Sequence, residues 1–168
     1  MIERILVSGG YLTWPGSRVP AAIGRGGLAW AKREGDGATP VGIFALRCLL
    51  YRADRLAMPS TGLTASAIHP SDGWSDDPRD MLYNQAVPLP HPYRHERLWR
   101  EDGVYDLIVP LGYNDDPPVP GLGSAIFLHC ARDDYGPTEG CVAIDRADLL
   151  RLVAGCGPDT VIEISGAM

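Results

Sequence analysis

A histidine and a cysteine in the C-terminal third of the chain have the types and spacing needed for nucleophilic chemistry. His129 ends an apolar run, and Cys141 follows twelve positions later, directly after Gly140. A thiol becomes an effective nucleophile when a neighbouring imidazole takes its proton. Glycine before the cysteine allows a tight turn, so that the amide of Cys141 can face the oxygen of an incoming carbonyl. The pattern predicts an enzyme with Cys141 as nucleophile and His129 as base.

The segments around these two residues predict the elements that position them. Residues 123–130 are apolar and predict a buried strand that carries His129 at its end. Residues 133–137 contain Asp, Gly and Pro and predict a loop. Residues 141–144 are apolar again and return the chain to the core. The expected arrangement is therefore strand, loop and strand, with the two reactive side chains at its ends.

Further elements are expected on both sides of this unit. Residues 42–51 and 104–111 are strand-like, and residues 160–164 predict a final strand. Asp145 predicts the N-cap of a helix over about residues 146–154, whose leucines form one apolar face. The chain has 20 Gly and 15 Pro and few helical patterns, which favours a mainly β fold.

Length and composition bound the domain organisation and the partners. With 168 residues, we expect one domain spanning residues 1–168. Residues 52–103 are rich in Pro, Asp, His and Trp without a period, and predict a long excursion of short strands and binding loops. The net charge is -6 without a basic stripe, so no nucleic-acid partner is expected. No apolar run approaches the roughly 18 residues of a membrane span.

The other cysteines are expected to be structural. Cys48 and Cys130 lie in apolar runs and predict buried thiols, and Cys156 lies between two glycines after the predicted helix. A structural disulfide among them remains an open alternative. There is no C-x-x-C pair, and His129 with Cys130 and Cys141 lacks a fourth ligand for zinc. We therefore expect no metal and no cofactor.

Two blocks of the chain resemble the motifs of a known family. The first is Thr39-Pro40 followed by Gly42 and Phe44, and the second is Leu128-His129 followed by residues 138–142, Thr-Glu-Gly-Cys-Val. In this order they are similar to the Thr-Pro-x-Gly-x-Phe and His…Ser/Thr-His-Gly-Cys motifs of the L,D-transpeptidase catalytic domain, the YkuD-type family of peptidoglycan enzymes. The resemblance covers roughly residues 20–165. It implies a β-sandwich with one or two short helices.

The chain departs from the family pattern at three points. Glu139 stands where the family usually has histidine, and Ala143 stands where Asn or Arg is common. The interval between His129 and Cys141 is also a few residues shorter. The departures suggest a divergent branch, with a different stem position or acceptor.

The resemblance implies two-step acyl transfer between peptide stems. Cys141 would attack a carbonyl of the donor stem, in most of the family that of diaminopimelate, while His129 takes the thiol proton and amides near Gly140 form the oxyanion hole. An amine of an acceptor stem would resolve the thioester and form a crosslink. The resemblance also implies acylation by carbapenems. We expect donor and acceptor stems as the partners of a monomeric protein.

Five further residues are candidates for substrate binding, each with an ordinary alternative. Thr138 is either a turn hydroxyl or a donor near the thiolate. Glu139 either orients the imidazole, reads a cationic group on the substrate, or is a solvated loop acid. Tyr135 lies on the loop between the reactive residues, some of which must border the substrate. Tyr113 and Asn114 either line the cleft or form a turn.

Competing functions remain open on the sequence alone. Hydrolysis of the same thioester would give an L,D-carboxypeptidase or endopeptidase. A papain-like or NlpC-type peptidase is disfavoured because its cysteine precedes its histidine. A non-catalytic wall-binding module is the alternative from another class. It is supported by residues 1–10, which predict a first strand rather than a secretory signal. The resemblance implies a periplasmic or cell-wall location, whereas the missing signal leaves a cytoplasmic one open.

Overall fold

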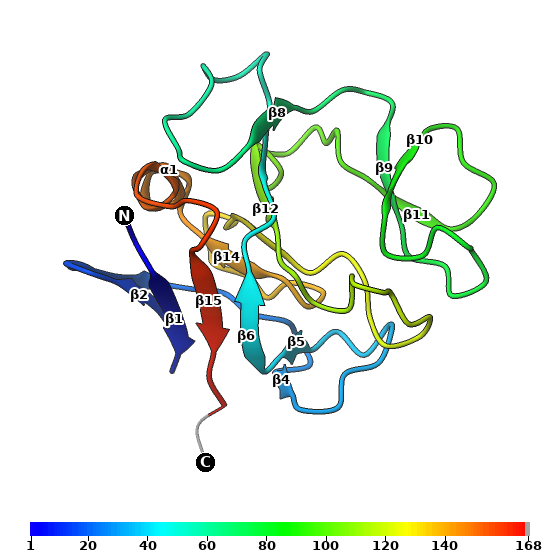
Figure 1. The fold of residues 1–168 in the computed structure, drawn as a ribbon, viewed down its shortest axis with the longest axis horizontal. Coiled ribbons are helices and arrows are strands. Elements are labelled where there is room, and N and C mark those ends of the chain that lie inside the picture. Colours follow the sequence, from blue (N-terminus) through cyan, green and yellow to red (C-terminus); the bar gives the residue numbers. More distant parts are fainter. Residues whose placement is uncertain (167–168) are drawn as a thin grey trace.

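The computed structural model describes residues 1–166 and is mainly β, as expected. Two five-stranded sheets and two smaller ones account for the strands of the described residues. Figure 1 shows the two ends of the chain in one sheet, where red β15 lies between blue β1 and cyan β6.

The first large sheet is built from the N- and C-terminal parts of the chain in the order β3-β2-β1-β15-β6. β1 pairs in parallel with β15, so the first and last strands of the chain are neighbours in this sheet. In β1 the buried residues Ile5 and Val7 alternate with exposed ones, as in a sheet with one solvated face. The strands of this sheet are β1 (Arg4–Ser8), β2 (Tyr11–Trp14), β3 (Ser17–Pro20), β6 (Gly42–Ala45) and β15 (Val161–Ile164).

The second large sheet has the order β14-β13-β12-β7-β8 and contains the segments predicted to carry the reactive residues. All residues of β12, β13 and β14 are buried, because this sheet is covered on both faces. β14 pairs in parallel with β13, with Leu128 opposite Val142. The strands are β7 (Leu49–Tyr51), β8 (Ala65–Ala67), β12 (Leu107–Pro110), β13 (Phe127–Cys130) and β14 (Val142–Ile144).

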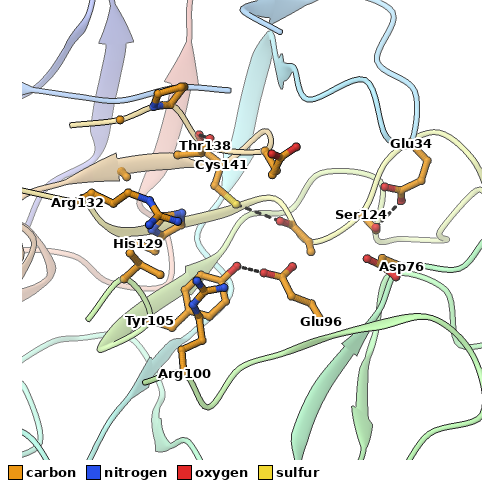
Figure 2. A pocket seen from close by; sticks show the side chains of 16 residues that line it. Glu34, Asp76, Glu96, Arg100, Tyr105, Ser124, His129, Arg132, Thr138 and Cys141 are labelled. Atoms are coloured by element: carbon orange, nitrogen blue, oxygen red, sulfur yellow. Dashed lines mark hydrogen bonds between the residues drawn. The ribbon is translucent and has the colours of Figure 1, made fainter. Parts of the chain in front are cut away.

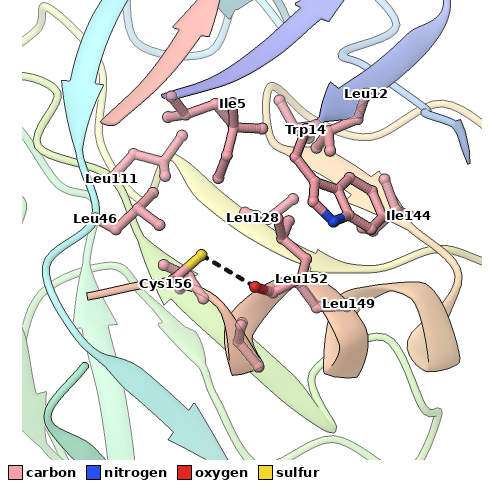
Figure 3. Close-up of a cluster of buried hydrophobic side chains, with 14 of the residues drawn as sticks. Ile5, Leu12, Trp14, Leu46, Leu111, Leu128, Ile144, Leu149, Leu152 and Cys156 are labelled. Carbon is pink, nitrogen blue, oxygen red and sulfur yellow. Dashed lines mark hydrogen bonds between the residues drawn. The ribbon is translucent and has the colours of Figure 1, made fainter. Parts of the chain in front are cut away.

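The apolar core lies between the two large sheets and also contains helix α1 (Arg146–Ala154). Ile5 and Leu12 from the first sheet meet Leu128 from the second, and all three are fully buried (Figure 3). Leu152 of α1 completes this cluster. Each such side chain stabilises the fold by roughly 1.5–3 kcal/mol relative to an exposed one.

Helix α1 confirms its predicted bounds and cap. The Asp145 side chain accepts hydrogen bonds from the amides of Ala147 and Asp148, two donors that the first helical turn leaves free. Leu149, Leu152 and Val153 form its buried face. With nine residues, α1 is too short to cross a bilayer, and residues 1–166 contain no helix that could.

The long excursion has a sheet of its own, with the order β10-β9-β11. It appears in green in Figure 1, away from the sheet that joins the chain ends. Its strands are β9 (Asp72–Ser75), β10 (Ala86–Pro88) and β11 (His95–Arg97). The remaining pair is β4 (Leu28–Ala29) and β5 (Thr39–Pro40), which contains the Thr-Pro part of the first family-like block; Gly42 and Phe44 of that block lie in β6. Both small sheets supply residues to the site described below.

Two sequence expectations are corrected. Residues 42–51 do not form one strand, because the chain leaves β6 of the first sheet after Ala45 and enters β7 of the second at Leu49. Leu46, buried between them, forms a β-bridge with Leu111.

Cys48 lies in this crossover and is half-buried rather than buried. All four cysteines are free, which removes the disulfide alternative.

Candidate active site

His129 and Cys141 line one cavity of about 210 Å³ (Figure 2). Alternation along the paired strands explains why they meet. Leu128 is opposite Val142, and both point into the apolar core. The residues on either side therefore point the other way, which places Cys141, just before β14, on the same face as His129. This geometry brings the two residues into one cavity.

The His129 ring is buried and its orientation is fixed. Nδ1 lies 2.9 Å from the carbonyl oxygen of Cys130, and because a carbonyl can only accept, Nδ1 carries the proton. This leaves Nε2 as the basic nitrogen. The ring of Tyr105 packs edge-on against the imidazole, with 5.3 Å between ring centroids. Burial lowers the pKa of His129 to about 4, so the imidazole is neutral near pH 7.

The Cys141 thiol is held by the backbone of the neighbouring strand. Its Sγ donates to the carbonyl of Ala125 at 3.2 Å and accepts from the amide of Phe127 at 3.3 Å. Burial first, and then the charge of Glu96, raise the pKa of Cys141 to about 12, although the Phe127 amide acts in the opposite direction. The free protein therefore holds a neutral thiol rather than the activated thiolate that the sequence pattern suggests.

The turn before Cys141 explains the glycine. Gly140 has φ of 138°, and a Cβ there would come within 2.9 Å of the Ala38 carbonyl oxygen. The Thr138 hydroxyl accepts from the Gly140 amide at 3.1 Å and donates to the Cys141 carbonyl at 2.7 Å. The buried Thr39 hydroxyl reaches the same carbonyl at 3.4 Å. The Thr-Pro block therefore helps to fix the cysteine turn.

Asn84, in the long excursion, fixes the backbone of Ala125, whose carbonyl accepts the hydrogen bond from the Cys141 thiol. Its Oδ1 accepts from the amide of Ala125 and from the indole of Trp74, both at 3.0 Å. Its Nδ2 donates to the carbonyls of Tyr113 and Asn114 at 3.2 and 2.7 Å. Ala125 has φ of 52°, a conformation that non-glycine residues adopt only when their surroundings enforce it. Asn84 supplies part of that constraint.

The predicted substrate-binding residues divide into two groups. Thr138 and Glu139 line the cavity, whereas Tyr113, Asn114 and Tyr135 do not. The Tyr113 hydroxyl donates to the backbone carbonyl of Leu122, and the Asn114 side chain bonds within its own turn. Tyr113 and Asn114 are therefore turn residues and do not line the cleft.

Glu139 makes its hydrogen bond at the rim of the cavity. Its carboxylate accepts from Nε of Arg25 at 2.9 Å and is 80% exposed. It therefore bonds to a guanidinium group rather than to the imidazole of His129. Ala143, the other departure from the family motif, lies on the cavity face of β14 and leaves room where a larger side chain would stand.

Several charged residues of the cavity were missed by sequence reasoning. Tyr105 donates from its hydroxyl to Glu96 of β11, and burial raises the pKa of both groups. Glu34 accepts from the Tyr83 hydroxyl at 2.7 Å and the Ser124 hydroxyl at 2.5 Å. These residues come from segments without a motif, so no local signal marks them.

The side chains and amides of the cavity are suited to acyl transfer by a thiol with an imidazole base. Within residues 1–166, no three His, Cys, Asp or Glu side chains converge in the manner of a metal site. A neutral imidazole with Nε2 free, a thiol in the same cavity and backbone amides at the cysteine turn can together form and resolve a thioester.

Comparison with known proteins identifies the family of the chain. The chain matches the YkuD family, described as the L,D-transpeptidase catalytic domain, over residues 6–164. Searches of curated proteins and of solved structures found no match. Because the family match covers nearly all of the 168 residues, the chain belongs to the YkuD family of L,D-transpeptidase catalytic domains.

Proposed function

We propose that this protein is a cysteine-dependent acyltransferase that crosslinks peptidoglycan stems by L,D-transpeptidation. Family membership implies peptidoglycan substrates. The observation that carries the proposal is the cavity in which the Cys141 thiol and the neutral, oriented imidazole of His129 lie on one face of paired strands.

In the first step, Nε2 of His129 takes the thiol proton as Sγ of Cys141 attacks the carbonyl carbon of an L-residue in the donor stem. The Gly140 amide is already bonded to Thr138, which leaves the Cys141 amide as the proposed oxyanion donor. One such donor contributes roughly 3–4 kcal/mol in other enzymes. The C–N bond then breaks, and the imidazolium returns its proton to the departing amine of the D-residue.

In the second step, an amine of the acceptor stem attacks the thioester. His129 takes a proton from this amine, the C–S bond breaks, and the thiolate of Cys141 recovers a proton. Attack by water instead would release a trimmed stem, which is the hydrolytic alternative. Both outcomes use the same thioester and differ only in the nucleophile that reaches it.

The two pKa values indicate when the thiol is activated. A thiol with a pKa of about 12 beside an imidazole with a pKa of about 4 does not exchange a proton in the free protein. Proton transfer is therefore coupled to the attack on the carbonyl, as in general base catalysis. This arrangement keeps the nucleophile inert until a substrate occupies the cavity.

We further propose a cell-wall-associated location and reaction with carbapenems, both on the ground of family membership.

Product analysis tests the proposal. Wild type, Cys141→Ala and the matched control Cys48→Ala are incubated with purified tetrapeptide muropeptides and analysed by liquid chromatography with mass spectrometry. Crosslinked dimers from wild type and Cys48→Ala, but not from Cys141→Ala, are expected. Trimmed monomers alone would make the protein a hydrolase, and the absence of any Cys141-dependent product would favour a non-catalytic wall-binding module.

A further inference from the structure

The thiol proton of Cys141 points away from the proposed base. Sγ makes two hydrogen bonds, at 3.2 Å to the Ala125 carbonyl oxygen and at 3.3 Å from the Phe127 amide. Because a carbonyl oxygen can only accept and an amide can only donate, the thiol proton lies on the Ala125 side. In Figure 2 the dashed line from the Cys141 sulfur runs away from His129. Within residues 1–166, no hydrogen bond joins Sγ to the imidazole.

The Ala125 carbonyl belongs to a short segment, residues 123–125, that side chains of the long excursion hold in place. The segment lies just before β13. The Tyr83 hydroxyl accepts from the Gly123 amide at 2.9 Å, and Oδ1 of Asn84 accepts from the Ala125 amide at 3.0 Å. Both of these side chains are buried. Two neighbouring residues of the excursion therefore bind alternate amides of the segment.

Ala125 keeps its conformation only while it is constrained. Its φ of 52° is unfavourable for a residue with a Cβ. The chain that follows it is fixed independently, because the Ile126 carbonyl accepts from the Leu111 amide at 3.0 Å and Phe127 begins β13. Without the bond to Asn84, relaxation would therefore move Ala125 and its carbonyl, whereas the Phe127 amide would stay on Sγ.

The position of Asn84 is fixed by the small sheet of the excursion. Its backbone amide donates to the carbonyl of Ser75 in β9 at 2.9 Å, and the Trp74 indole donates to its Oδ1 at 3.0 Å. Asn84 has φ of 57°, a conformation that asparagine adopts more readily than most residues. The geometry of the excursion is thus transmitted through one side chain to the acceptor of the thiol proton.

We propose that Asn84 is a positioning residue that holds the Ala125 carbonyl on the Cys141 thiol, and so keeps the thiol proton from Nε2 of His129 in the free protein. This deepens the proposed function and rests on it only for the role of Cys141 as nucleophile. Acylation then has to exchange one acceptor of the thiol proton, the Ala125 carbonyl, for another, the imidazole. The excursion contains neither reactive residue, yet it sets the reactivity of the thiol.

The charged groups around the thiol do not depend on Asn84. Glu96 raises the pKa of Cys141 and Lys32 lowers it. The other charged residues of the cavity are Glu34, Asp76, Arg100, Arg132 and Glu139, and its uncharged titratable groups are His129 and Tyr105. Among the described residues, none of these side chains bonds to Asn84. A substitution of Asn84 therefore acts on the thiol through the backbone of Ala125.

Infrared spectroscopy of the S–H stretch tests the proposal without turnover. Subtracting the spectrum of Cys141→Ala from that of wild type isolates the Cys141 band, because both proteins contain the other three thiols. A hydrogen bond lowers the S–H stretching frequency, so the band should lie below that of a thiol without an acceptor. His129→Phe removes the imidazole and should leave the band in place. A missing band at neutral pH, or a band that shifts in His129→Phe, would overturn the proposal.

Substitutions of Asn84 test the second half of the proposal. Asn84→Gly removes the side chain but allows the same φ, and its Cys141 band should move to higher frequency. Asn84→Asp keeps an oxygen for the Ala125 amide and should keep the wild-type band. The matched control Trp74→Phe removes the other donor to Oδ1 and should also keep it. An unchanged band in Asn84→Gly, or an equal shift in Trp74→Phe, would show that Asn84 does not position the carbonyl.

Alkylation of Cys141 by iodoacetamide provides a second readout. The thiolate attacks the methylene carbon, a C–S bond forms and iodide leaves, and peptide mass spectrometry gives the rate. The bond to Ala125 is made only by the protonated thiol, so its loss lowers the pKa of Cys141. At pH 8, Asn84→Gly should therefore react about two- to fourfold faster than wild type, and Trp74→Phe at the wild-type rate.

An equal or slower rate in Asn84→Gly would contradict the proposed role of Asn84. That result would leave the crosslinking proposal standing, because neither the infrared band nor the alkylation rate requires a donor stem. Conversely, a failure to crosslink muropeptides would change neither readout.

Discussion

The two faces of strand β13 are both buried, but burial has opposite consequences on them. Leu128 points into the apolar core and is fully buried. His129 points into the cavity and is 7% exposed. Burial of Leu128 removes hydrocarbon from water and stabilises the fold. Burial of His129 disfavours its charged form, which keeps the imidazole neutral and suited to the proposed role as a base. In the proposed mechanism, neighbouring residues of one strand therefore serve stability and chemistry separately.

Cys130 and Cys141 allow the same comparison between the core face and the cavity face. Burial raises the pKa of both Cys130, on the core face, and Cys141, on the cavity face, to about 12. The raised pKa therefore does not distinguish a structural thiol from a nucleophile. The difference is that Cys141 shares its cavity with the imidazole of His129, which in the proposed mechanism takes the thiol proton when a substrate is present.

Removing the base should have the largest effect. His129→Gln keeps a polar side chain of similar size but cannot take the thiol proton, so acylation by a tetrapeptide donor should slow by about 10³-fold. Single-turnover kinetics measures this rate. The melting temperature of the variant should equal or exceed that of wild type. Wild-type rates in His129→Gln would remove the functional distinction between the two faces.

Truncating the neighbouring core residue should have the reverse effect. Leu128→Ala leaves a cavity in the core, and we expect it to lower the free energy of unfolding by about 2–5 kcal/mol, measured by urea denaturation. Acylation by the fraction that remains folded should stay within a few-fold of wild type. A loss of acylation as large as that of His129→Gln would show that the two faces are not independent.

The pH dependence of stability should carry the signature of His129. Its pKa is 6.5 when unfolded and about 4 when folded, so between these values the unfolded state binds more protons. Stability should therefore fall as pH decreases from 6.5 to 4, by up to about 3 kcal/mol from this group. Comparing urea denaturation of wild type and His129→Gln across this window isolates the contribution. An identical pH dependence in both proteins would contradict the buried neutral imidazole.

Sequence reasoning predicted those parts whose signals are local. The Asp145 cap and the leucine pattern located α1 at its observed bounds. The apolar runs that end near His129 and begin at Cys141 predicted two strands, which are observed as the paired strands β13 and β14. In each case, the residues that carry the signal are close together in the chain.

The remaining features depend on contacts between distant segments. Glu34 and Glu96 reach the cavity from segments without a hydrophobic period, so nothing in the chain places them near Cys141. The strand predicted over residues 42–51 fails because an apolar run does not reveal that its two ends belong to different sheets. Asn84 was not predicted for a similar reason, since three of its four partners lie about 30 to 40 residues away.

The most direct test is to trap the thioester. Wild type and Cys141→Ala are mixed with a tetrapeptide donor, quenched with acid after a short interval, and analysed by intact mass and peptide mapping. The proposed acyl transfer predicts that wild type gains the mass of the donor minus its terminal D-residue, located on Cys141, and that the variant gains none. A wild-type protein that turns over the donor without such an adduct, or an adduct on another residue, would contradict Cys141 as the nucleophile.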